Sequence, residues 1–197
     1  SRRRANSANC AGTPSTGSAY AVSMSGSPSQ HDRAMLDLAA RAALRGFGSV
    51  DPNPTVGCVI GREHSGGVEV LAIGHHRRFG GLHAEAEALR ICAERGIDPA
   101  GATVWVTLEP CNHQGQQPPC TRALIEAGIG RVVYASADPN PVAVGGADAL
   151  RTAGIVVEQT DASTASIRAS APFRHRVQTS LPWMVAKWAQ TIDGFVA

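Results

Sequence analysis

The stretch ATVWVTLEPCNHQGQQPPC, residues 102–120, joins a strand pattern to an unusual loop. Its first half carries β-branched residues around Trp105, which is typical of a buried β-strand. Its second half places Cys111 and Cys120 at the two ends of a proline-rich loop that also holds His113. The two cysteines are compatible with a disulfide, with a metal site or with coincidence, and the rest of the chain decides between these readings.

Length and composition limit the number of domains and the kinds of partner that this protein can have. The chain has 197 residues, 43% of them hydrophobic, which suffices for one domain with a full core. The formal net charge of +2 argues against a protein that binds nucleic acid through a broad basic surface. No apolar run approaches the roughly 18 residues of a membrane span, and the arginines at residues 2–4 are not followed by the apolar segment of a secretory signal. We therefore expect neither a nucleic acid nor a membrane as partner.

The cysteine count favours metal binding over disulfides. The chain has five cysteines, an odd number, whereas a secreted disulfide framework would be denser and evenly paired. Cys58 and Cys92 also lie in apolar segments. We therefore expect a reducing, cytoplasmic location, where a close pair of cysteines more often binds a metal ion than forms a disulfide.

Helical and strand patterns alternate along the chain. Apolar residues recur with helical spacing in residues 31–46, 83–96, 121–130 and 147–154. Short apolar or β-branched runs predict strands at residues 56–61, 68–76, 102–110, 131–138 and 155–160. This alternation predicts a layered α/β domain.

The chain divides into three segments. Residues 1–29 are rich in Ser, Ala, Gly, Asn and Pro, so they lack the apolar surface of a core and are expected to be disordered. Residues 30–172 form the expected α/β domain. Residues 173–197 end in PWMVAKWAQTIDGFVA, a pattern that predicts a strand followed by a turn.

The tetrapeptide DPNP occurs twice, at residues 51–54 and 138–141, with unrelated flanks. Pro-Asn-Pro resists regular structure. Both copies are therefore interpreted as turns, and the second needs no role beyond that.

Three residues form a candidate metal site. His83 stands at the start of one predicted helix, Cys111 follows a predicted strand, and Cys120 opens the next helix. One imidazole and two thiolates are three protein ligands, and catalytic zinc sites use three and leave the fourth position to water. Glu85, two residues after His83, can reach that water without binding the metal.

This arrangement of His-x-Glu and Pro-Cys resembles that of the zinc-dependent nucleobase and nucleoside deaminases. In such a site zinc lowers the pKa of a water toward about 7. The resemblance implies that Glu85 moves a proton from the water to the base and then to the leaving amine. A closed structural zinc site is the alternative, since His113 offers a fourth protein ligand, and Glu85 would then have no catalytic role.

The loop CNHQGQQPPC narrows this resemblance. Eight residues separate Cys111 from Cys120, whereas most of these deaminases have Cys-x-x-Cys. Together with PNPTVGCVI, GHHRRFGGLHAE and VWVTLEPC, the loop resembles the riboflavin-biosynthesis pyrimidine deaminases. The likeness runs from about His31 to the end of the chain, where PWMVAKWAQTIDGFVA resembles the first strand of the reductase domain that usually follows, here truncated.

The resemblance implies a fold, a reaction and a site. The fold is a three-layer α/β/α cytidine deaminase-like domain with a mixed sheet of about five strands. The reaction is zinc-dependent hydrolytic deamination of 2,5-diamino-6-ribosylamino-4(3H)-pyrimidinone 5′-phosphate in riboflavin biosynthesis, and neither reductase activity nor NADPH binding is expected. Asn53, His76 and His113 match substrate-contacting positions of the family.

One departure from the family bears on the substrate. Gln116 stands where the family often has Lys or Arg, and a neutral amide makes a weaker phosphate contact than a charged group. Arg77, Arg78 and Arg122 are candidates to compensate. The alternatives that stay open are a deaminase of another amino-heterocycle or of a nucleic-acid base, and a non-catalytic zinc-stabilised module. A homo-oligomer is a possible assembly.

Overall fold

The computed structural model describes residues 20–23, 28–143, 145–160 and 163–195. The strands are β1 (Tyr20–Ser23), β2 (Gly57–His64), β3 (Gly67–His75), β4 (Thr103–Val106), β5 (Arg131–Tyr134) and β6 (Val156–Gln159). The helices are α1 (Pro28–Ala43), the 3-10 turn η1 (Leu44–Gly46), α2 (Ala84–Glu94), α3 (Cys120–Glu126), α4 (Gly146–Thr152), α5 (Thr164–Ala169) and α6 (Ala171–Thr179).

The strands form one mixed sheet in the order β1-β3-β2-β4-β5-β6. β1 and β2 each pair antiparallel with β3, and β2 also pairs antiparallel with β4, whereas β4, β5 and β6 run parallel. A parallel pair needs a crossover, and α3 and α4 provide the two crossovers at this end of the sheet.

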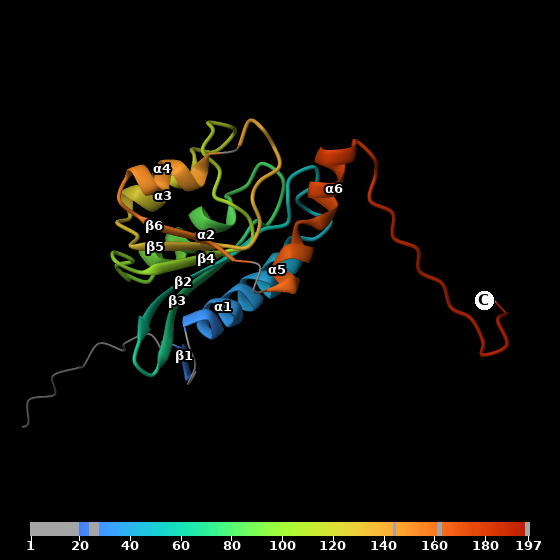
Figure 1. The fold of residues 1–197 in the computed structure, drawn as a ribbon, viewed down its shortest axis with the longest axis horizontal. Helices are drawn as coiled ribbons and strands as arrows, with labels where there is room; N and C mark the ends of the chain where they lie inside the picture. The colour runs from blue at the N-terminus through green and yellow to red at the C-terminus, as the bar shows by residue number, and fades with distance from the viewer. Residues whose placement is uncertain (1–19, 24–27, 144, 161–162, 196–197) are drawn as a thin grey trace, which may run out of the picture.

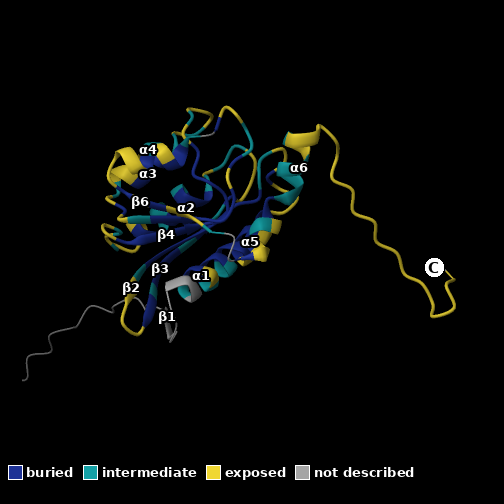
Figure 2. Cartoon of the chain, viewed as in Figure 1, coloured by how far each residue is buried: buried dark blue, intermediate teal, exposed yellow. Residues whose placement is uncertain are grey.

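Helices cover both faces of this sheet, with α2, α3 and α4 on one face and α1 with α5 on the other (Figure 1). Successive residues of a strand point to opposite faces, so the central strands supply two cores. Ile60 and Val104 pack in the core on the α2 side, and Val59 and Trp105 pack in the core on the α1 side. The middle of the sheet is therefore buried throughout (Figure 2), as expected for a sheet with helices on both faces.

The predicted three-layer α/β/α architecture is present, with one strand more than the expected five. The additional strand, β1, pairs with β3 at the sheet edge, with Tyr20 opposite Val70. The prediction that residues 1–29 are disordered is therefore wrong for residues 20–23, and for residues 28 and 29, which begin α1. Strand pairing through the backbone explains the error, because it needs no apolar side chains. Residues 1–19 and 24–27 lie outside the described part of the chain.

The short helix α5 was not predicted, because polar contacts hold it in place. The Ser163 hydroxyl accepts the Ser166 N–H at 3.0 Å and donates to the Asp37 carboxylate in α1 at 2.5 Å. The Ser166 hydroxyl donates to the Leu36 carbonyl of α1 at 2.6 Å. Such a helix lacks the stripe of large apolar residues by which a helix is recognised in a sequence.

The C-terminal segment corrects a second prediction. Residues 171–179 form α6, and the strand expected in PWMVAKWAQ does not form, since residues 182–189 pair with no strand of the described structure. This segment leaves the domain as an extended chain (Figure 1) whose side chains are exposed. A strand requires partners for its backbone N–H and C=O groups. Only the expected turn is present, where the Gly194 N–H donates to the Thr191 carbonyl at 3.0 Å.

No helix among the described residues combines the length and the apolar character that crossing a membrane requires.

Asp32 anchors α1 to the sheet. Its carboxylate accepts the indole N–H of Trp105 at 2.7 Å and two guanidinium N–H groups of Arg131 at 2.9 Å each. Arg131 also forms ion pairs with Glu63 and Glu158. Asp32 and Trp105 are 7% and 0% exposed, so water cannot replace this acceptor.

Asp32→Ala is expected to lower the free energy of unfolding by about 2–4 kcal/mol, because it leaves the buried Trp105 N–H without an acceptor and removes the most buried carboxylate from Arg131. Urea denaturation followed by tryptophan fluorescence measures the loss. Glu63→Ala is the matched control, since it removes a partly exposed partner of the same arginine and should cost less than about 1 kcal/mol. Equal losses in the two variants would show that the Asp32 contact is not special.

Candidate active site

Three metal-binding side chains converge at one point of the structure. His83 lies at the N-cap of α2, where its carbonyl accepts the Glu87 N–H at 2.9 Å. Cys111 lies in the loop after β4, and Cys120 is the first residue of α3. One ligand atom from each of the three residues lies within 4.8 Å of the other two.

The spacing of these atoms fits a tetrahedral zinc ion. His83 Nδ1 is 3.5 Å from Cys111 Sγ and 3.3 Å from Cys120 Sγ. Zinc bonds of about 2.3 Å to sulfur and about 2.0 Å to nitrogen, at tetrahedral angles, separate nitrogen from sulfur by roughly 3.5 Å. His113 is not part of this group. The three ligands therefore leave one position for a small molecule.

The two thiols differ in their pKa. Hydrogen bonds from Cys120 and His83 lower the pKa of Cys111 to about 4, which favours its thiolate form. The same hydrogen bond to Cys111, together with burial, raises the pKa of Cys120. The Cys120 backbone N–H also points to the Cys111 sulfur at 3.5 Å. A thiolate is the form that binds a metal, and a coordinated second thiol loses its proton too.

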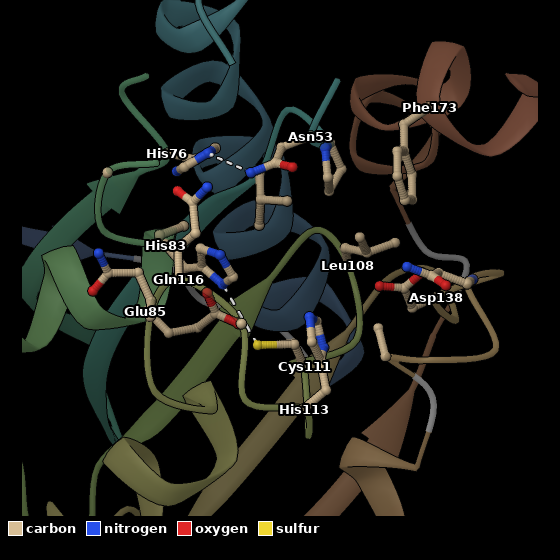
Figure 3. A pocket seen from close by; sticks show the side chains of 18 of the residues that line it. Asn53, His76, His83, Glu85, Leu108, Cys111, His113, Gln116, Asp138 and Phe173 are labelled. Carbon is tan, nitrogen blue, oxygen red and sulfur yellow. Dashed lines mark hydrogen bonds between the residues drawn. The ribbon is translucent and has the colours of Figure 1, made fainter. Parts of the chain in front are cut away.

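Glu85 is a buried carboxyl group beside these ligands (Figure 3). It is 3% exposed, and its burial, with the nearby charge of Cys111, raises its pKa to about 7. A cation bound by the three ligands would lower this pKa, because it favours the carboxylate. A carboxyl group with a pKa close to neutral can take up and release a proton during one reaction cycle.

Two glycines allow the ligand-bearing segments to approach each other. A Cβ atom on Gly74 of β3 would lie 2.2 Å from the Ala84 carbonyl oxygen at the start of α2. A Cβ atom on Gly146 of α4 would lie 1.8 Å from the carbonyl oxygen of Pro110, next to Cys111. Glycine is required where backbones pack this closely, so both residues help to set the positions of the ligands.

A cavity of about 230 Å³ opens in front of the ligands. His83, Glu85 and Cys111 lie in its wall. The cavity also has an apolar side, to which Phe173 points from α6 (Figure 3). Its other walls come from both DPNP segments, from the residues just after β4 and from the loop between the two cysteines. They include Asn53, Leu108, His113, Gln116, Asp138 and Asn140.

Asn53 and His76 form a hydrogen-bonded pair, and the contact of His76 with the Leu82 carbonyl determines which atoms donate. His76 Nδ1 lies 2.8 Å from the Leu82 carbonyl oxygen, which can only accept, so Nδ1 carries the proton. Nε2 is then the acceptor for the Asn53 amide nitrogen at 3.3 Å. Burial lowers the pKa of His76. This favours the neutral ring, in which Nε2 can accept the hydrogen bond from Asn53. Asn53 is thereby left with its Oδ1 as an acceptor, while both nitrogens of His76 are occupied within the protein.

His113 and Gln116 bring the loop between the cysteines to the cavity. Both residues lie in the cavity wall, and Figure 3 shows the His113 ring beside Cys111. His113 Nδ1 is buried without a hydrogen-bond partner. A buried polar atom without a partner is costly, so this nitrogen is suited to a polar group of a bound molecule.

The second DPNP segment contributes to the cavity, which its sequence pattern did not predict. Asp138 and Asn140 were interpreted as turn residues, yet both line the same cavity as Asn53. The Asp138 carboxylate accepts the Asn140 N–H at 2.9 Å, and burial raises its pKa. The repetition of DPNP was the sequence feature that could have indicated these residues, because both copies line the same cavity.

Glu109 was also missed, and it joins three segments of the site. It precedes Pro110 and Cys111 and is 7% exposed. Its carboxylate accepts the Ala147 N–H in the first turn of α4 at 2.9 Å and the Asp138 N–H at 3.4 Å. This carboxylate therefore holds the cysteine loop against α4 and the second DPNP segment.

Glu109→Gln is expected to weaken zinc binding or to lower kcat/KM by about 10–100-fold, the usual effect of losing a group that orients a ligand. The amide has one accepting oxygen where the carboxylate has two, and its N–H groups would face backbone donors. Competition with a chelator and steady-state kinetics measure the two effects. Glu126→Gln on α3, which loses only the exposed pair with Arg122, is the control. A Glu109 variant that matches this control in both measurements would contradict the assignment.

Comparison with known proteins agrees with these features. Residues 29–136 match the family model described as the cytidine and deoxycytidylate deaminase zinc-binding region. The riboflavin biosynthesis protein RibD of Actinobacillus pleuropneumoniae is 42% identical over 176 residues, which cover 86% of this chain and 45% of that protein. RibD of Escherichia coli is 41% identical over 160 residues, covering 81% and 42%. This chain thus spans less than half the length of these relatives.

A solved structure also resembles the whole domain. It is the diaminohydroxyphosphoribosylaminopyrimidine deaminase/5-amino-6-(5-phosphoribosylamino)uracil reductase of Thermotoga maritima. The TM-score is 0.77 at 37% sequence identity, and the match covers 84% of this chain and 46% of that one. This likeness confirms the predicted fold.

Proposed function

We propose that this chain, which belongs to the cytidine and deoxycytidylate deaminase zinc-binding family, hydrolyses the amino group of a pyrimidine with zinc as its cofactor. One observation carries the proposal: His83, Cys111 and Cys120 meet at zinc-binding distances with the buried carboxyl group of Glu85 beside them. A cavity opens in front of this group. A structural zinc site needs neither the carboxyl group nor the cavity.

The substrate we propose is 2,5-diamino-6-ribosylamino-4(3H)-pyrimidinone 5′-phosphate, and the products are the 5-amino-6-ribosylamino-uracil 5′-phosphate and ammonia. The support comes from RibD relatives at about 40% identity and from the polar cavity wall. Several acceptors and donors surround the cavity, as a base with many exchangeable N–H groups requires. A deaminase for nucleic acid would be expected to show aromatic stacking platforms and a basic groove.

Zinc, when bound by His83, Cys111 and Cys120, supplies a Lewis acid that lowers the pKa of a water to about 7. Glu85 accepts a proton from the attacking water and donates it to the ring nitrogen of the base. It then accepts the second proton of that water, from the new hydroxyl group on the ring carbon, and donates it to the departing amine. Asn53 accepts an N–H of the base through Oδ1, since His76 holds its amide nitrogen. His113 contacts the ligand through its unpartnered Nδ1.

The catalytic unit we propose is the segment 30–172, extended by α6, because Phe173 belongs to the cavity wall. The partner of this unit is a small molecule. The proposed compartment is the cytoplasm, where reducing conditions keep both cysteines available to the metal.

Ammonia release from the ribotide by the zinc-loaded chain tests the proposed function. We expect turnover with this substrate and at least about 100-fold lower kcat/KM with cytidine or deoxycytidylate, which lack the second amino group and the ribosylamino link. Turnover of cytidine or deoxycytidylate at an equal rate would assign a different pyrimidine, and no turnover of any of the three would refute the proposal.

A further inference from the structure

The proposed substrate carries a phosphate, but the site cavity offers no permanent cation. Among the described residues, its wall contains no lysine and no arginine. Gln116 occupies the loop position where the family often has a basic residue. A phosphate bound by amides and histidines alone would be held weakly, because charge-assisted hydrogen bonds are the strong ones.

Two of the three arginines considered from the sequence are occupied. Arg77 forms an ion pair with Glu87 at 2.6 Å. Arg122 forms an ion pair with Glu126 at 2.7 Å and lies at a different cavity, with Asn112 and Pro119. A carboxylate offsets the charge of each of these guanidinium groups, and neither arginine is in the wall of the site cavity.

A second cavity of about 440 Å³ adjoins the first and contains an arginine. The two cavities share Asn53 and Phe173 as wall residues, so these two residues lie where the cavities meet. Arg176, one turn after Phe173 on α6, lines the second cavity together with Trp183.

The position of Arg176 is defined and its charge is not neutralised. Its Nη2 donates to the Pro52 carbonyl oxygen at 2.6 Å, next to Asn53, and its Cζ lies 5.9 Å from the centre of the Phe173 ring. Asp51 lines the same cavity, but none of the described carboxylates forms an ion pair with Arg176. A guanidinium has five N–H donors, so most of them remain for a ligand.

We propose that Arg176 is the phosphate-binding cation of this site, with the second cavity as the phosphate subsite. The inference rests on the proposed function, because it requires a substrate in which a pentose 5-phosphate is attached to the base. The base then lies in the first cavity, next to His83 and Cys111, and the pentose lies between Asn53 and Phe173, where the two cavities meet. The phosphate then lies in the second cavity, at the Arg176 guanidinium. The arginine on α6 thus replaces the basic loop residue that is absent at Gln116.

Binding of ribose 5-phosphate and of ribose to the zinc-loaded chain, measured by titration calorimetry, tests the subsite without any turnover. We expect the wild-type chain to prefer ribose 5-phosphate, and Arg176→Gln to reduce that preference by about tenfold or more, as for the loss of a charge-assisted contact. Arg176→Lys should keep part of the preference. Arg78→Gln is the comparison variant, because Arg78 is the remaining candidate: it is exposed beside Gly81 of the first cavity but is in the wall of neither cavity. This variant should keep all of the preference.

The outcomes separate the subsite from the function. The subsite proposal fails if the wild-type chain shows no preference for ribose 5-phosphate, or if Arg78→Gln removes that preference and Arg176→Gln does not. It also fails if Arg176→Gln weakens the binding of ribose and of ribose 5-phosphate by the same factor. That last pattern would mean that Arg176 only positions the Asn53 loop through Pro52. An Arg176-dependent preference in a chain that does not deaminate the ribotide would support the subsite and refute the proposed function.

Discussion

Glu85→Gln is expected to abolish deamination while zinc stays bound. General acid–base catalysis contributes about 100- to 10,000-fold, and this carboxyl group is asked to move a proton twice in each cycle. We therefore expect kcat to fall by at least about 1,000-fold. Glutamine has the size of glutamate and fits the same buried position, so the fold and the three ligands should be unaffected. The measurements are ammonia release and the zinc content of the dialysed protein.

Glu87→Gln is the matched control for this variant. Glu87 is the next but one residue of the same helix and is equally buried, but its carboxylate pairs with Arg77 and Arg90, and it is not among the residues of the cavity wall. We expect near wild-type kcat. If Glu85→Gln also kept near wild-type kcat, Glu85 would not be the acid–base group. If it lost zinc together with activity, it would be acting as a ligand.

Cys120→Ala is expected to remove both zinc and activity. Cys120 is 1% exposed and its sulfur lies 3.3 Å from His83 Nδ1, so no water-accessible side chain can substitute for it. The wild-type chain should hold about one zinc ion per domain. With only two protein ligands left, the variant should lose this ion on dialysis against a weak chelator. Stability should fall as well, because a ligand that binds only the folded state stabilises it. Metal analysis and thermal unfolding with and without added zinc measure both effects.

Cys92→Ala and His113→Ala complete this experiment. Cys92 is a buried cysteine of α2 that belongs to the core and not to the metal group, so its loss should leave zinc and activity in place. His113→Ala should retain zinc and bind substrate more weakly. Zinc loss in His113→Ala would support the closed structural site, and zinc retention in Cys120→Ala would contradict the ligand assignment.

The sequence by itself determined the order of the elements from α1 to β6 and the composition of the candidate metal site. Helix and strand patterns are local, so the burial of residues such as Val59 and Ile60 on opposite faces can be read from neighbouring positions. His83 with Glu85, and Cys111 with Cys120, are also local pairs, and each stands at the start or end of an element that the same patterns predict.

Only the tertiary structure decided which distant polar residues share the cavity. Glu109 meets Ala147 across 38 residues, and Arg176 meets Pro52 across 124. Such contacts depend on single hydrogen bonds between loops and helix ends, and these have no period along the chain. The polar docking of α5 on α1 escaped prediction for the same reason, since Ser163 and Ser166 leave no apolar stripe. The burial of helices and strands follows a period that is visible in the sequence. Contacts between two loops depend instead on how the sheet and its helices pack.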